Sequence, residues 1–260
     1  MKRPLRILLV NERGCFDPGI MAMAKILGDV HNVVVVAPRG SIRGQGHSLT
    51  ATAPIRAEQF AALSKARLFA VDGTPCDCVG LALDKLLRSK PDLIISGIDP
   101  YHNVGDIIYS SGVVMAAICG TNHGIPSMAV SAHITDRNSE KEYLSVARAV
   151  LKKLDYLRGI IKPGIALNVN FPLGYKTKEF QICPLTVGMA ISSYSYKTNP
   201  FGREFYWLNK NIEEMGLKAL NQKGDVFYLK KGVISITPLS TDMTADGEAF
   251  EALRNSGIAL

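Results

Sequence analysis

The stretch LRILLVNERGCFDPG, residues 5–19, decides the fold, because an apolar strand ends there in a charged loop and a helix follows. Residues 5–10 are typical of a buried strand, and residues 19–29 carry apolar side chains at helical spacing. In an open α/β sheet, ligands bind in the crevice beyond the carboxyl ends of the strands. The loop that contains Asn11, Glu12, Arg13 and Gly14 is therefore the first candidate for a functional site.

Length and composition are those of a globular protein with one large α/β domain, or one such domain with an extension. The chain has 260 residues, of which 47% are hydrophobic and 20% charged, enough to build a substantial core.

The formal net charge of +7 favours anionic ligands such as phosphates and nucleotides. The sequence has no arginine-rich block, so we expect no nucleic-acid polymer as a partner. No apolar run approaches the ~20 residues that span a bilayer, so we expect no membrane partner either.

The cysteines favour a reducing, cytoplasmic location. There are 5 of them, an odd number, scattered through a chain that starts without a signal peptide. Cys76 and Cys78 lie two residues apart, but the other cysteines and the histidines lack zinc-finger spacing, so we expect no structural metal at this pair. Cys15 lies near the first loop, but no local signature singles out a histidine that would make it a nucleophile.

Strand-like and helix-like segments alternate through the first two thirds of the chain, which is typical of βαβ units around a parallel sheet. The predicted strands are residues 5–11, 33–37, 68–72, 92–96, 126–132 and 165–171, and the predicted helices are residues 19–29, 77–88, 112–123 and 141–157. The sequence therefore predicts a Rossmann-like, doubly wound, mostly parallel sheet.

Beyond Pro172 the pattern changes to strand-like segments with few helical patterns between them. These segments are residues 179–183, 203–208, 225–229 and 233–236, followed by a predicted helix over residues 245–254. We therefore divide the chain into residues 1–172, an α/β core that carries the site, and residues 173–260, a β-hairpin extension with a C-terminal helix. Exposed hairpin edges are commonly paired with another copy of the chain, which favours a homo-oligomer.

The loop over residues 97–111 is a second candidate for function, because it is polar and longer than an ordinary strand-to-helix connection. It contains Asp99, His102, Asn103, Gly105 and Asp106. His102 has a plainer interpretation as a solvated side chain and Asp106 as the cap of a turn. Asp17 and Ser111 have one as caps of the predicted helices that they precede.

Motifs along nearly the whole chain resemble the SurE survival-protein family of metal-dependent 5′/3′-nucleotidases. The resemblance rests on Asn11, Gly14, Pro18-Gly19, Ala37-Pro38, Ser48-Leu49-Thr50, Gly73-Thr74-Pro75 with Asp77 and Val79, Ser96-Gly97-Ile98, Asn103, Gly105, Ser111-Gly112, Asn168-Val169-Asn170-Phe171-Pro172, and Ser235-Ile236-Thr237-Pro238-Leu239 with Asp242 and Thr244. It implies a Rossmann-like core, a swapped β-hairpin, dimers or tetramers, and release of phosphate from nucleoside monophosphates.

The resemblance also implies a divalent cation, Mg²⁺ or Mn²⁺, held by two adjacent aspartates, a serine and an asparagine. In this sequence those positions carry Glu12, Arg13, Arg43 and Asp99. Guanidinium groups cannot ligate a metal ion and would repel it. We therefore expect a degenerate metal site, with metal-dependent phosphomonoesterase activity weak or lost.

Two interpretations of these charges stay open. In one, Glu12 and Asp99 pair with Arg13 and Arg43 in an ion network that replaces the cation. In the other, the arginines bind phosphate through their forked N–H donors. For the second, the candidate catalytic residues are Glu12 and Asp99, and the candidate phosphate-binding residues are Asn11, Arg13, Arg43, Asn103, Gly105, Ser111 and Gly112. The alternative functions are a non-catalytic nucleotide- or phosphate-binding protein and a structural or interaction homologue.

Overall fold

The computed structural model describes residues 3–61, 66–175, 179–187, 193–209 and 223–244. Its strands are β1 (Arg6–Val10), β2 (Asn32–Pro38), β3 (Ala57–Phe60), β4 (Arg67–Val71), β5 (Leu93–Asp99), β6 (Ser127–Ala132), β7 (Ile165–Phe171), β8 (Phe180–Ile182), β9 (Ser193–Thr198), β10 (Glu204–Asn209) and β11 (Ile234–Ser240). Its helices are α1 (Pro18–Gly28), α2 (Pro75–Leu81), α3 (Gly112–Asn122), α4 (Glu140–Ile160) and α5 (Asp225–Lys230), with a π-helical segment over Ala82–Leu86 and a 3₁₀ helix over Gly105–Ser110.

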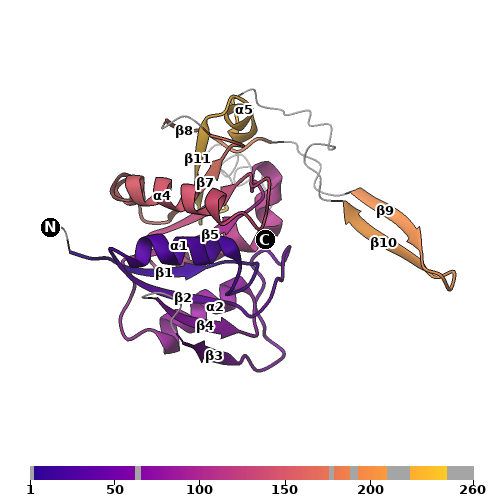
Figure 1. Cartoon of the computed structure of the whole chain (residues 1–260), viewed down its shortest axis with the longest axis horizontal. Helices are drawn as coiled ribbons and strands as arrows, with labels where there is room; N and C mark the ends of the chain where they lie inside the picture. The colour runs from indigo at the N-terminus through magenta and orange to yellow at the C-terminus, as the bar shows by residue number, and fades with distance from the viewer. Residues whose placement is uncertain (1–2, 62–65, 176–178, 188–192, 210–222, 245–260) are drawn as a thin grey trace, which may run out of the picture.

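The predicted mostly parallel, doubly wound sheet is confirmed (Figure 1). Nine strands lie in the order β3-β4-β2-β1-β5-β6-β7-β11-β8. The pairings from β4 to β7 are parallel, whereas β3 is antiparallel to β4 and β11 is antiparallel to β7. None of the helices in the described ranges is long and apolar enough to cross a membrane.

Both faces of the sheet are covered by helices, which explains why every residue of the central strands β5 and β6 is buried. Ile7 and Leu9 of β1 belong to a core cluster with residues of α1 and α4. Leu8 and Val10, which point to the opposite face, belong to a second cluster with residues of α2 and α3. Adjacent residues of one strand therefore pack into two separate cores.

The sheet order reverses between β1 and β5, and this reversal positions the site. From β1 the chain moves to β2 and β4 on one side, and then returns to β5 on the other side. A crevice opens at such a switch point beyond the carboxyl ends of the two strands. Glycine permits the tight packing there, because a Cβ on Gly97 of β5 would collide with the carbonyl oxygen of Val130.

The second half of the chain differs in part from its prediction. Residues 225–229, predicted as a strand, form the helix α5, whose first residue, Asp225, accepts hydrogen bonds from backbone N–H groups. β3 and β9 were not predicted. β11 and β8 extend the main sheet, while β9 and β10 form a separate antiparallel ribbon that stands clear of the α/β body in Figure 1. The predicted helix over residues 245–254 lies outside the described residues.

Candidate functional site

The candidate site lies at the carboxyl ends of β1 and β5, as predicted. Glu12 follows β1 by two residues, and Asp99 is the last residue of β5 rather than part of a loop. The 3₁₀ helix replaces the second half of the predicted loop over residues 97–111. Glu12 and Asp99 are only 3% and 1% exposed, so both carboxylates lie inside the protein.

Glu12 is held at the N-terminus of α3. Its Oε2 accepts a hydrogen bond from the backbone N–H of Gly112 at 2.8 Å, and its Oε1 lies 3.5 Å from Nε of Arg43. A helix N-terminus favours negative charge. A Cβ at position 112 would lie 2.9 Å from Oε2 of Glu12 and 2.8 Å from Cγ of Pro75, so glycine lets the carboxylate approach the helix.

Asp99 keeps one carboxylate oxygen free for chemistry. Its Oδ2 accepts a hydrogen bond from Nδ2 of Asn103 at 2.8 Å, whereas Oδ1 is buried without a hydrogen-bond partner among the described residues. Burial, together with the negative charge of Glu12, raises the pKa of Asp99 to about 7, although Arg43 acts in the opposite direction. Asp99 therefore exchanges a proton in the neutral pH range.

Arg43 lies between Glu12 and an aromatic ring. Its Cζ lies 4.2 Å from the centroid of the Tyr101 ring, and Arg137 stacks on the same ring at 4.8 Å. Such contacts stabilise a guanidinium group and hold its plane. Nε of Arg43 is buried and makes no hydrogen bond within the described part of the chain. Oε1 of Glu12 lies 3.5 Å from it, an ion pair without a hydrogen bond.

Arg13 is paired with a different acid from those expected. Its Nε lies 2.9 Å from Oδ2 of Asp17, whose Oδ1 accepts a hydrogen bond from the backbone N–H of Gly19 and so caps α1. The prediction that Asp17 caps this helix is confirmed. The expected pairing of Arg13 with Glu12 or Asp99 is wrong as a direct contact, since Asp17 holds its Nε.

Asn103 ties the site loop to the neighbouring strands. Its Nδ2 also donates to Oγ of Ser131 in β6 at 2.8 Å, and its backbone N–H donates to Oδ1 of Asn170 at 2.9 Å. Its carbonyl oxygen accepts hydrogen bonds from Nδ2 of Asn168 and Asn170 in β7. The Asn168-Val169-Asn170 motif therefore positions the loop that begins at Asp99.

Gly105 is anchored from a distant part of the chain. Its backbone N–H donates to Oδ2 of Asp225 at 3.0 Å, and its φ of +49° lies in the left-handed region. Oδ1 of Asp225 accepts from the N–H groups of Thr186 and Val226. The sequence reasoning missed Asp225 because that contact spans 120 residues.

Asn11 and Ser111 use their side chains within the protein. The Asn11 side chain closes the first loop by two hydrogen bonds to Gly14. Its Oδ1 accepts from the N–H of Gly14, and its Nδ2 donates to the carbonyl oxygen of Gly14. Ser111 caps α3 by accepting from the N–H of Val114 at 3.2 Å, as its plainer interpretation predicted. His102, another residue of the predicted loop, lies 2.9 Å through Nε2 from the carbonyl oxygen of Phe171.

The structure thus brings Glu12, Arg43 and Asp99 close enough to interact electrostatically, and it places Asn11, Asn103, Gly105, Ser111 and Gly112 in the loops and the helix start around them. Sequence reasoning also missed Tyr101 and Arg137. Tyr101 lies two residues beyond Asp99, in the loop already suspected, but nothing in the sequence indicates that arginines from two distant segments would stack on it.

Comparisons with known proteins agree with this geometry. The family model described as survival protein SurE matches residues 7–192. A 5′-nucleotidase SurE from Geobacter metallireducens is 37% identical over 247 residues, covering 92% of this chain and 93% of the relative. One from Pseudothermotoga lettingae is 32% identical over 240 residues, covering 92% and 90%.

A solved structure shows the same fold. The crystal structure of the SurE protein from Aquifex aeolicus aligns with a TM-score of 0.76 and 32% sequence identity, covering 96% of this chain and all of that one. Identity of this extent over nearly the full length, with a shared fold, shows common descent. The chain belongs to the SurE survival-protein family.

Proposed function

We propose that this chain is a SurE-like phosphomonoesterase by descent that binds the phosphate of a nucleoside monophosphate between Glu12, Arg43 and Asp99, with metal-dependent hydrolysis weak or lost. Family homology supports the phosphomonoesterase part, because the relatives from Geobacter metallireducens and Pseudothermotoga lettingae both carry the name 5′-nucleotidase SurE. The contact between Arg43 and Glu12 carries the rest of the proposal.

The residues at the family's ligand positions do not fit a divalent cation. Mg²⁺ requires near-octahedral oxygen coordination, which Glu12 and Asp99 alone cannot supply. Oε2 of Glu12 is engaged by Gly112, and Arg43 lies 3.5 Å from Oε1. A divalent ion about 4 Å from the guanidinium charge would be repelled by on the order of 8 kcal/mol at the effective dielectric near a protein surface. We therefore derive no catalytic step through a metal.

The same residues favour an anion. Nε of Arg43 is a buried donor that makes no hydrogen bond to any residue the structure describes, and a phosphate oxygen is the acceptor that a guanidinium group prefers. Arg137 adds a second positive charge at the Tyr101 ring. Five of the residues that the family resemblance suggests for phosphate binding are already hydrogen-bonded within the protein: Asn11, Asn103, Gly105, Ser111 and Gly112. Their main role is therefore to shape the loops around the phosphate.

Glu12 and Asp99 are the carboxylates that would act in any remaining hydrolysis. Oδ1 of Asp99 has no hydrogen-bond partner in the described ranges, and this oxygen together with a pKa of about 7 suits Asp99 to accept a proton from water. Glu12 is committed to Gly112 and Arg43, so its role would be to hold the guanidinium group in place.

The test measures hydrolysis and binding separately. Protein incubated with AMP and Mn²⁺ should release no phosphate above a blank, whereas AMP or inorganic phosphate in EDTA should raise the Tm. Arg43→Ala should abolish the rise, and Arg56→Ala, whose side chain is 74% exposed, should not. EDTA-sensitive turnover would overturn the loss of activity. Absence of both turnover and binding would leave a structural or interaction role.

A gain-of-function variant gives an independent check. Replacing Glu12 and Arg13 with aspartate, Arg43 with serine and Asp99 with asparagine restores the ligand types that the resemblance implies. Mn²⁺-dependent phosphate release should rise above that of the unmodified protein. If this folded variant binds Mn²⁺ but its turnover does not rise, arginine substitution is not what limits hydrolysis.

We also propose that residues 173–260, which add β8 and β11 to the main sheet of the α/β core at residues 1–172, carry an oligomerisation extension in the ribbon of β9 and β10. The ribbon of β9 and β10 exposes Tyr194, Tyr206 and Trp207 by 65%, 66% and 63%. Exposed aromatic faces of this kind commonly mark protein interfaces. Light scattering should give the mass of a dimer or tetramer, and Trp207→Lys should reduce it.

The five free, buried cysteines suit a reducing cytoplasm.

A further inference from the structure

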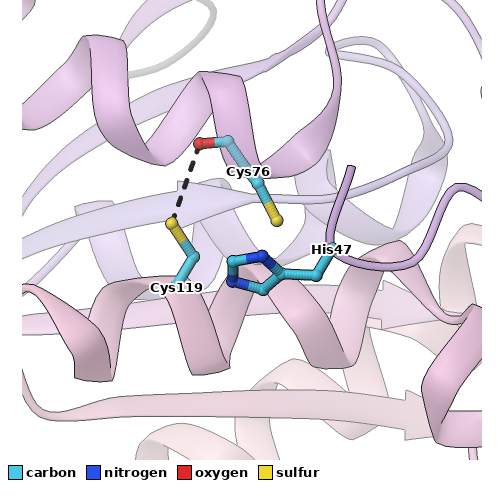
Figure 2. Close-up of side chains that lie close together, drawn as sticks. All are labelled: His47, Cys76 and Cys119. Atoms are coloured by element: carbon cyan, nitrogen blue, oxygen red, sulfur yellow. Dashed lines mark hydrogen bonds between the residues drawn. The ribbon is translucent and has the colours of Figure 1, made fainter. Parts of the chain in front are cut away.

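A second cluster of chemically active side chains lies among α2, α3 and the loop that follows β2. His47 comes from the loop, Cys76 from the first turn of α2, and Cys119 from α3. One ligand atom from each residue lies within 4.8 Å of the other two. Figure 2 shows the His47 imidazole beside the sulfurs of Cys76 and Cys119.

These distances suit a small cation. Zinc binds sulfur at about 2.3 Å and imidazole nitrogen at about 2.0–2.1 Å, so tetrahedral ligands lie roughly 3.5–4 Å apart. The present separations of up to 4.8 Å would close to that range with small side-chain rotations. Two thiolates and one imidazole are ligands for a thiophilic metal and poor ligands for Mg²⁺.

Within the part of the chain that the structure describes, the two sulfurs make only long hydrogen bonds to backbone carbonyl groups. Sγ of Cys76 lies 4.0 Å from the carbonyl oxygen of Gly46, and Sγ of Cys119 lies 3.9 Å from the carbonyl oxygen of Cys76, so both are long, weak hydrogen bonds. Both cysteines are free and buried, whereas His47 is exposed. The cluster is therefore shielded from solvent where Cys76 and Cys119 lie and accessible to solvent at His47.

We propose that His47, Cys76 and Cys119 bind one thiophilic d¹⁰ cation, Zn²⁺, through an imidazole nitrogen and two thiolate sulfurs. The two thiol protons are released to solvent on binding, and a water molecule occupies the fourth position, on the open side. The sequence reasoning considered Cys76 with Cys78, but the structure places Cys76 beside Cys119, which is 43 residues away.

This site would be distinct from the crevice of Glu12 and Asp99 but connected to it through one loop. Arg43 lies four residues before His47 in that loop. A metal bound by His47 would fasten the loop to α2 and α3, in addition to the hydrogen bond from the N–H of Gly46 to the carbonyl oxygen of Ser110. Zn²⁺ binding would therefore order the segment that carries Arg43.

The test uses the full chain, reduced and freed of metal under anaerobic conditions, and titrated with Co²⁺ and then Zn²⁺. One Co²⁺ per chain should give a thiolate-to-cobalt charge-transfer band and tetrahedral d–d bands, which Zn²⁺ abolishes by displacement. Losing a residue that only supports a metal ligand costs roughly 10- to 100-fold in metal affinity. Cys119→Ala and His47→Ala each remove a ligand itself, so each should weaken Zn²⁺ binding by more than that.

Matched controls separate this site from other thiols and imidazoles. Cys78→Ala removes a buried cysteine of the same helix, and His123→Ala removes an exposed histidine, so both should bind Zn²⁺ like the unmodified protein. His47→Ala changes an exposed loop side chain, so its folding does not depend on core packing. Unchanged binding in His47→Ala, or a cobalt spectrum without the charge-transfer band, would overturn the proposal. A Cys76–Cys119 disulfide formed in air, with no cobalt spectrum in the reduced protein, would also overturn it.

Discussion

Replacing Asp99 with asparagine should stabilise the protein at and above neutral pH. The carboxylate of Asp99 is 1% exposed, and its Oδ1 has no hydrogen-bond partner among the described residues. Asparagine has nearly the same shape, and its Oδ1 can still accept the hydrogen bond that Asn103 now donates to Asp99. The substitution therefore removes a buried negative charge at small cost in packing.

The magnitude follows from the pKa of Asp99, which burial raises to about 7, against about 3.9 for an aspartate in an unfolded chain. Because the folded pKa is the higher one, the unfolded state releases its proton first, and stability falls as the pH rises from about 4 to about 7. At about 1.4 kcal/mol per pKa unit, the penalty above pH 7 is at most roughly 4 kcal/mol. The added N–H donors of asparagine cost about 1–3 kcal/mol if unpaired, which leaves a net gain of about 1–3 kcal/mol.

Thermal unfolding followed by circular dichroism in EDTA, at pH 4, 6 and 8, measures this gain. For a domain of this size, about 1–3 kcal/mol corresponds to a rise in Tm of roughly 2–12 °C. The rise should be present at pH 8 and should disappear, or change sign, at pH 4. Asp84→Asn, at a position 71% exposed, should show no such pH dependence. A Tm of Asp99→Asn at or below that of the unmodified protein at pH 8 would show that the buried Asp99 carboxylate does not destabilise the fold.

Three further substitutions test other parts of the structure. Gly112→Ala places a Cβ 2.9 Å from Oε2 of Glu12, and should lower the free energy of unfolding in urea by about 1–3 kcal/mol and weaken phosphate binding. Asp225→Ala leaves the backbone N–H groups of Gly105 and Thr186 without their acceptor and should cost at least about 2 kcal/mol in the same assay. Asp92→Asn should lower the Tm at pH 7, because hydrogen bonds from Arg6 lower the pKa of Asp92 to about 2; this difference should vanish as the pH falls from about 4 to about 2.

The α/β core could be predicted because its strands are buried on both faces. Residues 7–10 of β1 are all buried, so the strand appears in the sequence as a continuous apolar run. Helix α4 was equally visible, since its buried residues Tyr143, Ala147, Val150 and Leu154 recur at helical spacing. Edge strands such as β3 lack this signal, because Glu58 and Gln59 interrupt it.

The prediction for residues 225–229 was wrong because local preference and tertiary structure disagree there. Val226, Phe227 and Tyr228 favour strands. The segment instead forms α5, because Asp225 is completely buried and accepts hydrogen bonds from Gly105 and Thr186. Those partners lie far away in the sequence, so no local pattern could indicate them.

The place of the candidate site was predictable, but its pairings were not. The rule that ligands bind beyond the strand ends brings Glu12 and Asp99 together without any knowledge of side-chain positions. It does not say that Asp17 would pair with Arg13, or that Tyr101 would hold Arg43. Such choices depend on distances of a few ångströms between loops, which the sequence does not determine locally.

Exchanging a bound cation for arginine separates two tasks that a metal performs together. A metal neutralises phosphoryl oxygens and also lowers the pKa of the attacking water, whereas a guanidinium group can only neutralise charge. Arg43 is 31% exposed and stacked on Tyr101, so it can turn from Glu12 towards an incoming phosphate while Glu12 keeps its hydrogen bond from Gly112. Asp99 can take up a proton near neutral pH, which removes one negative charge from the crevice. Under the proposed function, the residues that oppose metal-dependent hydrolysis therefore still allow a phosphate to bind.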